Sequence, residues 1–553
     1  MTIDTPEEEA PVPGVLPHDL LHSLPEHTPD DVRAALENGE VRDALRAAIE
    51  AGDLGLATDV LRIGWFALLR DDSRRPSAHV LEQLTPSQLK AHPLLAMALG
   101  LIYNADRLRR AKAVYYFGLA AAGIRSRSTR DTPVERALVS ASESAAFRLL
   151  GKTGVSVRSA RTALRALEDI HDERASLIGY LPRLYSQLGT SLYYGGHDEE
   201  ALHVFERGFA EHGTADPSSF DNLAMMLGIH ALNGDMSEVT ALIDVAREEP
   251  WSDLQRATYA GTFYRIAEAV LALERLDVSG ARAHLDAMVH DRRSIEHWVA
   301  IARVEALTSL MGGEPARALA ELEAFVVLRG VEGAARSTRY RLASVRSVLH
   351  LALGNYDAAA TVLKHDGGTT AQDHVDRARL ALAADRTSDA LRSLRDIAGR
   401  RQTSRTRIEA LTIEAAIGLR FGHGRRTDAL IEQLVSVMRA SGQRLALRLL
   451  PQADLDAVLI ALRRAGAADL ADAVTAPSVI DEVDRPSLTP REMAVLRVLA
   501  RTASVSDIAT ELFVSTNTVK SQLRSVYRKL GARNRDEALA AAIHLQLLRA
   551  DRS

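Results

Sequence analysis

The chain has 553 residues, 46% hydrophobic residues, a formal net charge of −5 and no cysteine. Its length allows several domains with sizeable cores, and the lack of cysteine excludes disulfide frameworks and thiolate chemistry. It contains no run of about 18 apolar residues, so no membrane span is predicted. Its acidic, proline-rich start lacks the pattern of a secretory signal. The sequence therefore predicts a cytoplasmic protein without a membrane partner.

Charge is distributed unevenly along the chain. Residues 486–553 contain 11 Lys and Arg and 6 Asp and Glu, a net charge of +5, whereas residues 1–485 carry −10. A small basic module joined to a large acidic body is typical of a nucleic-acid-binding protein with a soluble carrier. A solvated helical surface would give the same balance, so the motifs must decide between the two.

Composition divides the chain into four segments. Residues 1–30 are acidic and rich in proline, which favours disorder. Residues 31–474 have apolar residues three and four apart almost throughout, which predicts helices. Residues 475–487, TAPSVIDEVDRPS, have two prolines and no apolar stripe, which indicates a linker. Residues 488–553 form the basic module.

A turn followed by a helix start recurs in the second segment, as in YGGHDEEALHVF, LGNYDAAATVL and ADRTSDALRSL. Measured at one small residue early in the second helix, successive copies are 38, 42, 37, 41, 31 and 39 residues apart. A period near 40 with one turn per copy predicts stacked helix pairs, which small residues allow to approach closely. The small residues are Ala201, Val239, Ala281, Ala318, Ala359, Ala390 and Ala429.

The copies resemble tetratricopeptide repeats, although their period is longer than the ~34 residues of that family. The expected fold class is therefore all-α: an α-solenoid of stacked helix pairs (tetratricopeptide-like), followed by a small four-helix helix-turn-helix domain. An irregular α-solenoid outside that family is the alternative. Such arrays offer extended concave surfaces, so we expect this region to receive a peptide, a protein or a small-molecule effector.

The basic module contains dense helix-start signals. Thr489–Glu492 is a capping box with proline at the first helical position. Ser504, Ser515 and Asn534 can each cap a further helix, and Gly531 is placed to end the third. These signals predict four short helices at 490–501, 505–512, 516–530 and 535–548.

The third predicted helix has two different faces. At about 100° per residue, its valines and leucines project to one side. The other side carries Asn517, Lys520, Arg524 and Arg528. A cationic helix that follows a short helix and a tight turn is the arrangement of a helix-turn-helix, whose second helix enters the DNA major groove. The predicted core of this motif is Ile508, Ala509, Leu512, Val519, Leu523, Val526 and Leu530.

The motifs LTPRE, IATELFVSTNTVK and YRKLG occur in this order within residues 488–547. This segment resembles the LuxR-type helix-turn-helix domain of bacterial transcription regulators. The chain departs from that family at Thr502, where glycine is usual, and at Gln522, where histidine is frequent, so a DNA sequence preference cannot be transferred. The resemblance implies base contacts by Lys520, Ser521 and Arg524. It implies phosphate contacts by Asn517, Thr518, Gln522, Arg528 and Lys529.

The resemblance also implies partners. We expect sequence-specific binding to double-stranded DNA, contact with RNA polymerase, and a homodimer on DNA formed through the last helix. LAAAIHLQLL offers an apolar face there, and the alternative is that this face closes the core of the module. An effector on the repeats would change dimerisation or release the DNA-binding domain. The alternative is a non-enzymatic interaction scaffold whose helix-turn-helix docks protein. The basic side chains of the third helix favour DNA.

The sequence contains no catalytic or metal-binding constellation. LLGKTG at Leu149–Gly154 resembles the end of a phosphate-binding loop, but Ala146 replaces the first glycine of that motif. The 18 histidines are scattered singly, without an HExxH pattern. We therefore predict a protein that is not an enzyme and that uses no metal and no cofactor.

Overall fold

The structure, a computed structural model, describes residue 24 and residues 27–64, 74–104, 110–126, 133–170, 181–211, 217–248, 251–257, 261–288, 296–422, 424–480 and 488–544. Within these ranges the regular elements are helices, with one isolated parallel bridge between Pro451 and Ile480. None of the described helices is both long and apolar enough to cross a membrane. The segment 1–30, expected to be disordered, lies mostly outside the described residues.

The chain forms two compact units. The first comprises Met1–Ile229 and Leu242–Tyr264, and the second comprises His230–Ala241 and Arg265–Ser553. Three helices contribute to both units: α14 (Pro217–Asn233), α15 (Met236–Glu248) and α17 (Thr262–Glu274). The other helices of the first unit are α2 (Asp30–Glu37), α3 (Val41–Glu50), α4 (Leu54–Ile63), α6 (Arg74–Leu81), α7 (Pro86–Ala91), α8 (Pro93–Asn104), α9 (Arg110–Ser126), α10 (Pro133–Leu149), α11 (Thr153–Glu168), α12 (Leu181–Tyr194), α13 (Asp198–Ala210) and α16 (Asp253–Ala257).

The second unit continues the repeats and ends with the basic module. Its repeat helices are α18 (Val278–Asp286), α19 (Trp298–Met311), α20 (Pro315–Leu328), α21 (Val331–Ala334), α22 (Arg336–Ala352), α23 (Tyr356–His365), α24 (Ala371–Ala383), α25 (Thr387–Arg395), α26 (Ser404–Arg420), α27 (Arg425–Ser441), α28 (Leu445–Arg448), α29 (Gln452–Arg464) and α30 (Ala468–Asp472). The module consists of α31 (Pro490–Leu499), α32 (Val505–Glu511), α33 (Thr516–Leu530) and α34 (Arg535–His544).

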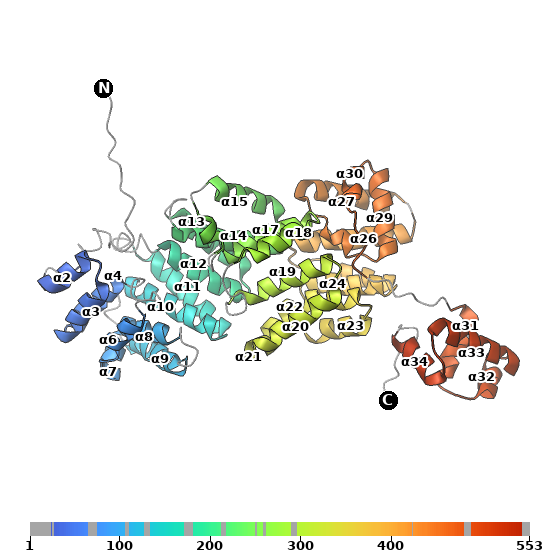
Figure 1. The fold of residues 1–553 in the computed structure, drawn as a ribbon, viewed down its shortest axis with the longest axis horizontal. Coiled ribbons are helices and arrows are strands. Elements are labelled where there is room, and N and C mark those ends of the chain that lie inside the picture. Colours follow the sequence, from blue (N-terminus) through green and yellow to red (C-terminus); the bar gives the residue numbers. More distant parts are fainter. Residues whose placement is uncertain are drawn as a thin grey trace, which may run out of the picture. The chain divides into compact units, whose positions relative to one another are not determined.

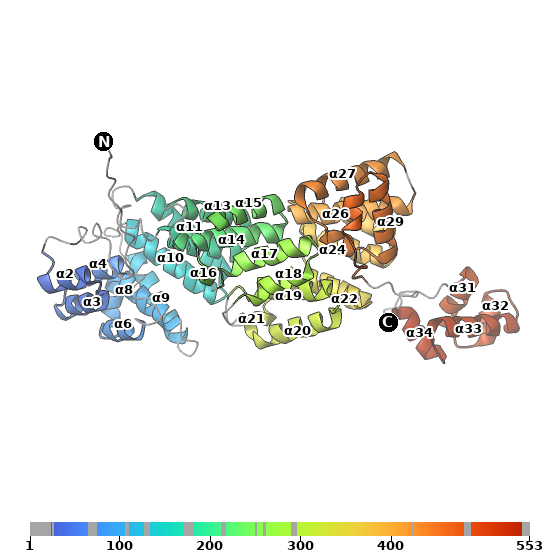
Figure 2. The same ribbon diagram turned by 45° about the horizontal axis from the view of Figure 1, so that its top comes forward.

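Successive helices of the repeats pack as pairs, as Figures 1 and 2 show for α12 with α13 and for α26 with α27, which confirms the predicted all-α architecture. A left-handed residue follows the first helix of a pair, for example Gly196 at φ 82° and Gly313 at φ 81°. This conformation lets the next amide return to a carbonyl five residues earlier, a bond of 3.0 Å for His197 and Leu192. The chain reverses tightly at this point, so the small residue five positions later becomes buried.

The register of the last repeat differs from the sequence alignment. The first six small residues of the alignment are buried, whereas Ala429 is exposed. Thr427 is buried instead, and it faces Gly418 of α26. Thr427 lies five residues after Gly422, whose φ is 105°. The left-handed turn residue therefore determines which residue of the second helix is buried. The expected small residue of this repeat was assigned to Ala429, two positions after the residue that is buried.

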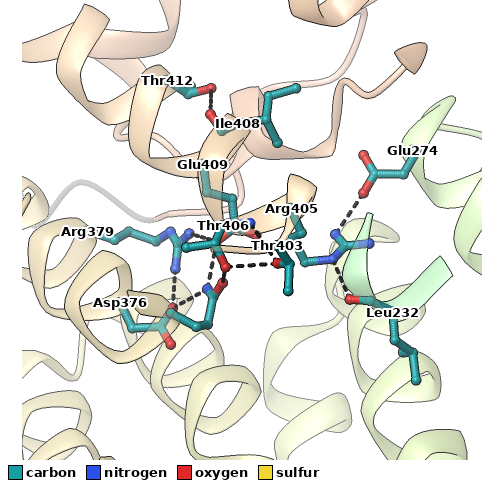
Figure 3. A network of polar contacts seen from close by, with 11 residues as sticks. Leu232, Glu274, Asp376, Arg379, Thr403, Arg405, Thr406, Ile408, Glu409 and Thr412 are labelled. Carbon is teal, nitrogen blue, oxygen red and sulfur yellow. Dashed lines mark hydrogen bonds and ion pairs between the residues drawn. The ribbon is translucent and has the colours of Figure 1, made fainter. Parts of the chain in front are cut away.

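A buried polar network joins segments of the second unit that are distant in sequence (Figure 3). Arg405, near the start of α26, donates from Nη1 to Glu274 Oε1 at 2.7 Å and from its other nitrogens to carbonyls at the end of α14. On the same helix, Glu409 accepts from Arg379 Nη2 at 2.6 Å, and Arg379 Nη1 donates to Asp376 Oδ1 at 2.7 Å. All five charged side chains are buried, so each depends on its partners.

Residues 477–480, within the segment expected to be a linker, pack on the repeats. The amide of Ser478 donates to Gln452 Oε1 at 2.8 Å, and the amide of Val479 donates to the Arg448 carbonyl at 2.9 Å. Ile480 is buried and bridges to Pro451. The apolar pair at 479 and 480 explains this packing, because burial of Ile480 and partial burial of Val479 are favourable. Residues 481–487 lie outside the described residues.

Candidate nucleic-acid interface

The predicted start and stop signals of the basic module are confirmed by its hydrogen bonds. Thr489 and Glu492 form a reciprocal capping box at α31. Ser504 accepts from the Asp507 amide at α32, and Ser515 accepts from the Thr518 amide at 3.1 Å at α33. The amide of Glu537 donates to Asn534 at 2.8 Å at α34. Gly531 ends α33 in the left-handed conformation, at φ 64°.

The boundaries of these helices agree with the expected four, to within two residues at every described end. The fourth helix was expected to reach residue 548, and its residues beyond His544 lie outside the described residues. The apolar stretch proposed for dimerisation, residues 539–548, begins within α34: Ala542 is buried in the core of the module and Leu539 packs against it, whereas residues 545–548 lie outside the described residues.

One face of α33 is buried in the core of the module. Val519 and Val526 are fully enclosed, Leu523 is buried, and Leu530 packs at the edge of the same cluster. Ile508 and Ala509 of α32 are also in this core, and Leu512 packs against it. The seven residues expected to form the helix-turn-helix core therefore lie together, and α32 fixes the orientation of α33.

The opposite face of α33 is exposed and cationic. The exposed residues are Asn517, Thr518, Lys520, Ser521, Arg524 and Arg528. In the part of the chain that the structure describes, Lys520, Arg524 and Arg528 have no carboxylate partner. The helix TNTVKSQLRSVYRKL itself contains no acidic residue. This face therefore presents positive charge that is not neutralised within the described chain.

Lys529 differs from the other basic residues of α33, because it points to an internal partner. Its Nζ lies 2.7 Å from Glu492 Oε2, and the Ser525 hydroxyl donates to Glu492 Oε1 at 2.7 Å. These bonds, from Lys529 first and Ser525 second, together with the Thr489 amide, lower the pKa of Glu492 from its ordinary 4.5 to about 2. Glu492 thus caps α31 and also fixes it to α33. Sequence reasoning recognised only the capping role.

Thr502 stabilises the turn between α31 and α32. Its hydroxyl accepts from the Ser504 amide at 3.2 Å and donates to Asp507 Oδ2 at 3.3 Å. Thr502 does not have a left-handed backbone, so this turn does not require the glycine that is usual in the family at this position. Arg535 has a structural contact as well, since its guanidinium donates to the Leu499 carbonyl at the end of α31.

Gln522 lies at the border of the two faces. It is half-buried, and its Oε1 is enclosed without a hydrogen-bond partner among the described residues. It is therefore less accessible than Thr518 and Ser521, which are exposed on the same helix. No group of three His, Asp or Glu side chains that could hold a metal ion occurs among the described residues. The module thus offers an exposed cationic helix face.

Comparison with known proteins agrees with this geometry. Residues 486–542 match the family model described as bacterial regulatory proteins, luxR family. The chain is 33% identical over 61 residues to the spore germination protein GerE of Bacillus subtilis (strain 168), which covers 11% of this chain and 82% of that protein. It is 44% identical over 64 residues to the transcriptional regulatory protein YdfI of Bacillus subtilis (strain 168), covering 12% of this chain.

The similarity to longer regulators is confined to one domain. The chain spans 30% of the length of YdfI and 29% of the probable transcriptional regulatory protein NarL of Mycobacterium tuberculosis (strain ATCC 25618 / H37Rv), to which it is 41% identical over 63 residues. The crystal structure of the pentatricopeptide repeat protein PPR10 from maize aligns over 95% of both chains at 10% identity, with a TM-score of 0.20. That score establishes no shared fold.

Proposed function

The chain belongs to the luxR family of bacterial regulatory proteins, and we propose that it regulates transcription by binding a specific sequence of double-stranded DNA through α33. The observation that carries this proposal is the exposed basic face of α33. Its Lys520, Arg524 and Arg528 have no carboxylate partner among the described residues, while the opposite face is fixed in the core. An α-helix fits the major groove, where a helix-turn-helix presents the first turns of its second helix to base edges.

The exposed residues of α33 are assigned roles by their chemistry. Arg524 suits bidentate contact with the O6 and N7 atoms of guanine, and Lys520 and Ser521 reach base edges on the same face. Asn517, Thr518 and Arg528 contact phosphates, which position the domain without reading sequence. Lys529 is assigned a positioning role through Glu492, because that ion pair already occupies its ammonium group.

A genomic capture experiment tests this function. Purified full-length protein is incubated with fragmented genomic DNA, and the retained fragments are sequenced beside those retained by a Lys520→Ala/Arg524→Ala double variant. A shared motif that the wild type enriches and the variant loses is the expected result. Equal enrichment by the two proteins would show that α33 does not read the sequence, and the scaffold function would then be preferred.

The finer part of the proposal is regulation by the repeats. We propose that an effector bound to the repeat region alters how the DNA-binding module is held, and that two copies bind DNA as a homodimer. Arg448 supports such coupling. It is buried, and its guanidinium donates to the carbonyls of Met311 at 2.9 Å and Pro477 at 3.0 Å. The end of α19 and the segment leading to the module thus share one side chain.

Arg448 is a buried charged group, so loss of either carbonyl would leave part of its guanidinium without a hydrogen-bond acceptor. Desolvation lowers its pKa, and among the described residues it bonds only to carbonyl groups. A shift of α19 would therefore weaken the hydrogen bond from Arg448 to Pro477 and loosen residues 477–480 from the repeats. Arg448→Met in the full-length protein should accelerate amide exchange at Ser478 and Val479 and alter DNA affinity. Unchanged exchange at both residues would refute this route.

A further inference from the structure

Among the described residues, three that are not glycine have a left-handed backbone: Leu276 at φ 63°, Asp385 at φ 57° and Phe513 at φ 54°. All three follow a helix, and in each case the next amide returns to a carbonyl five residues earlier, as Val514 does to Ala509 at 3.0 Å. Glycine is the usual residue here, because a side chain in this conformation is strained. Each exception therefore needs a compensating interaction.

Two of the three are compensated within the chain. Leu276 packs against the apolar core of the second unit. Asp385, a residue type that tolerates this conformation, pairs with Arg420 Nη1 at 2.9 Å. Both also occupy the turn position where other repeats have glycine, so the fold imposes the conformation and supplies the contact.

Phe513 has no such compensation inside the described chain. It lies between α32 and α33 with 95% of its surface exposed, and it is not part of the core cluster of the module or of the residues packed against it. A phenylalanine there combines backbone strain with a solvated ring. The adjacent Val514 is also exposed. This uncompensated residue indicates a contact with another molecule.

The position of Phe513 identifies that molecule. It precedes by two residues Ser515, which caps α33, so it stands at the end of α33 that enters the major groove in a helix-turn-helix. Beyond Val514, the exposed side chains that follow Phe513 in the chain include the polar and basic residues Thr516, Asn517 and Lys520, and the exposed Glu511 before Phe513 is paired with Arg501. The hydroxyl, amide and ammonium groups of Thr516, Asn517 and Lys520 suit contact with DNA better than contact with an apolar protein surface.

We propose that Phe513 contacts DNA and reads a thymine through its C5 methyl group, at the edge of the surface formed by α33. This inference rests on the proposed function. Thymine alone among the four bases carries an apolar group in the major groove, and an aromatic ring is a suitable partner for it. Phe513 thus adds an apolar specificity element to the polar contacts of Lys520 and Arg524.

Replacement by glycine separates this role from a structural one. Phe513→Gly removes the backbone strain, so amide exchange in α32 and α33 of the full-length protein should remain as slow as in the wild type or become slower. The probe is a duplex selected from a randomised library by the full-length wild-type protein. Its affinity for Phe513→Gly, and for Phe513→Ala, should fall on the order of tenfold, from the loss of a partly buried aromatic ring.

Deoxyuridine identifies the base. Replacing thymines of the probe one at a time removes only the methyl group, and at one position this should weaken wild-type binding about fourfold. Phe513→Gly should not respond to the same replacement. Phe421→Ala is the matched control, since Phe421 is 75% exposed at the end of α26 in the repeats. It should bind the probe as the wild type does.

Other outcomes overturn the inference in distinguishable ways. If Phe513→Gly bound the probe as tightly as the wild type while Lys520→Ala/Arg524→Ala lost binding, the contact between Phe513 and DNA would be refuted. The proposed function would remain intact. Normal DNA affinity with lost transcription would assign Phe513 to a protein partner instead. Equal sensitivity of wild type and Phe513→Gly to every deoxyuridine would refute the thymine contact. Failure of the wild type to select any sequence would remove the proposed function as well.

Discussion

The buried arginines of the repeat region and the exposed basic residues of α33 differ in where their negatively charged partners lie. Arg379 and Arg405 of the repeats are buried, and each bonds to carboxylates at 2.6–2.7 Å. Lys520 and Arg524 of α33 are exposed and have no carboxylate partner among the described residues. A buried charge must be compensated within the chain, whereas an exposed basic side chain remains available to a phosphate or a base. The location of its partner therefore separates a structural arginine from a candidate functional one.

The largest expected effect is in the repeats. Arg379→Ala leaves Asp376 and Glu409 buried beside each other without their common partner. We expect a loss of about 3–5 kcal/mol in the free energy of opening of α24 and α26. Amide exchange of these helices in the full-length protein measures this quantity.

Arg392→Ala is the control for that experiment. Arg392 pairs with Asp389 at 3.0 Å on an exposed helix surface, and such pairs contribute about 0–1 kcal/mol. If both variants opened with similar free energies, the buried network would not hold these helices together.

The next effect concerns the ion pair inside the module. The folded pKa of Glu492 is about 2, below its ordinary value of 4.5. Because the folded pKa is depressed, this group stabilises the fold fully above about pH 4.5, and the contribution is lost as pH falls toward 2. Glu492→Gln should destabilise the module at neutral pH by about 1–3 kcal/mol and flatten this pH dependence.

Amide exchange of α31 and α33 at neutral pH and unfolding between pH 5 and about 2 measure the two parts of that prediction. Glu511→Gln is the control, because Glu511 pairs with Arg501 on the exposed surface. An unchanged pH dependence in Glu492→Gln would mean that another carboxyl group dominates acid unfolding.

The smallest expected effect sharpens the assignment of α33. Arg528, toward the end of the helix, should contact phosphate and no base, so Arg528→Ala should weaken binding to all DNA sequences to a similar extent. The slope of the logarithm of the binding constant against the logarithm of salt concentration should fall in magnitude by about 1. Anisotropy titrations at several salt concentrations measure it. A change in sequence preference would place Arg528 at a base instead.

Much of the module could be predicted because its signals are local. A cap such as Ser515 acts on an amide three residues away, and the two faces of α33 follow from the helical repeat. The same reasoning located the turns of the repeats. It failed at Ala429, because composition marks a small residue, whereas the left-handed Gly422 decides which residue is buried.

The sequence by itself determined the helix starts, the apolar faces and the basic surface of α33, since each depends on residues within a few turns of one another. Only the tertiary structure decided which charges are neutralised. Arg405 meets Glu274 across 131 residues, and Lys529 meets Glu492 across 37. The helical repeat places Lys520 and Lys529 about 180° apart around α33, but it does not show that Lys529 meets Glu492, because the partner of a charged side chain depends on which helices the packing brings together.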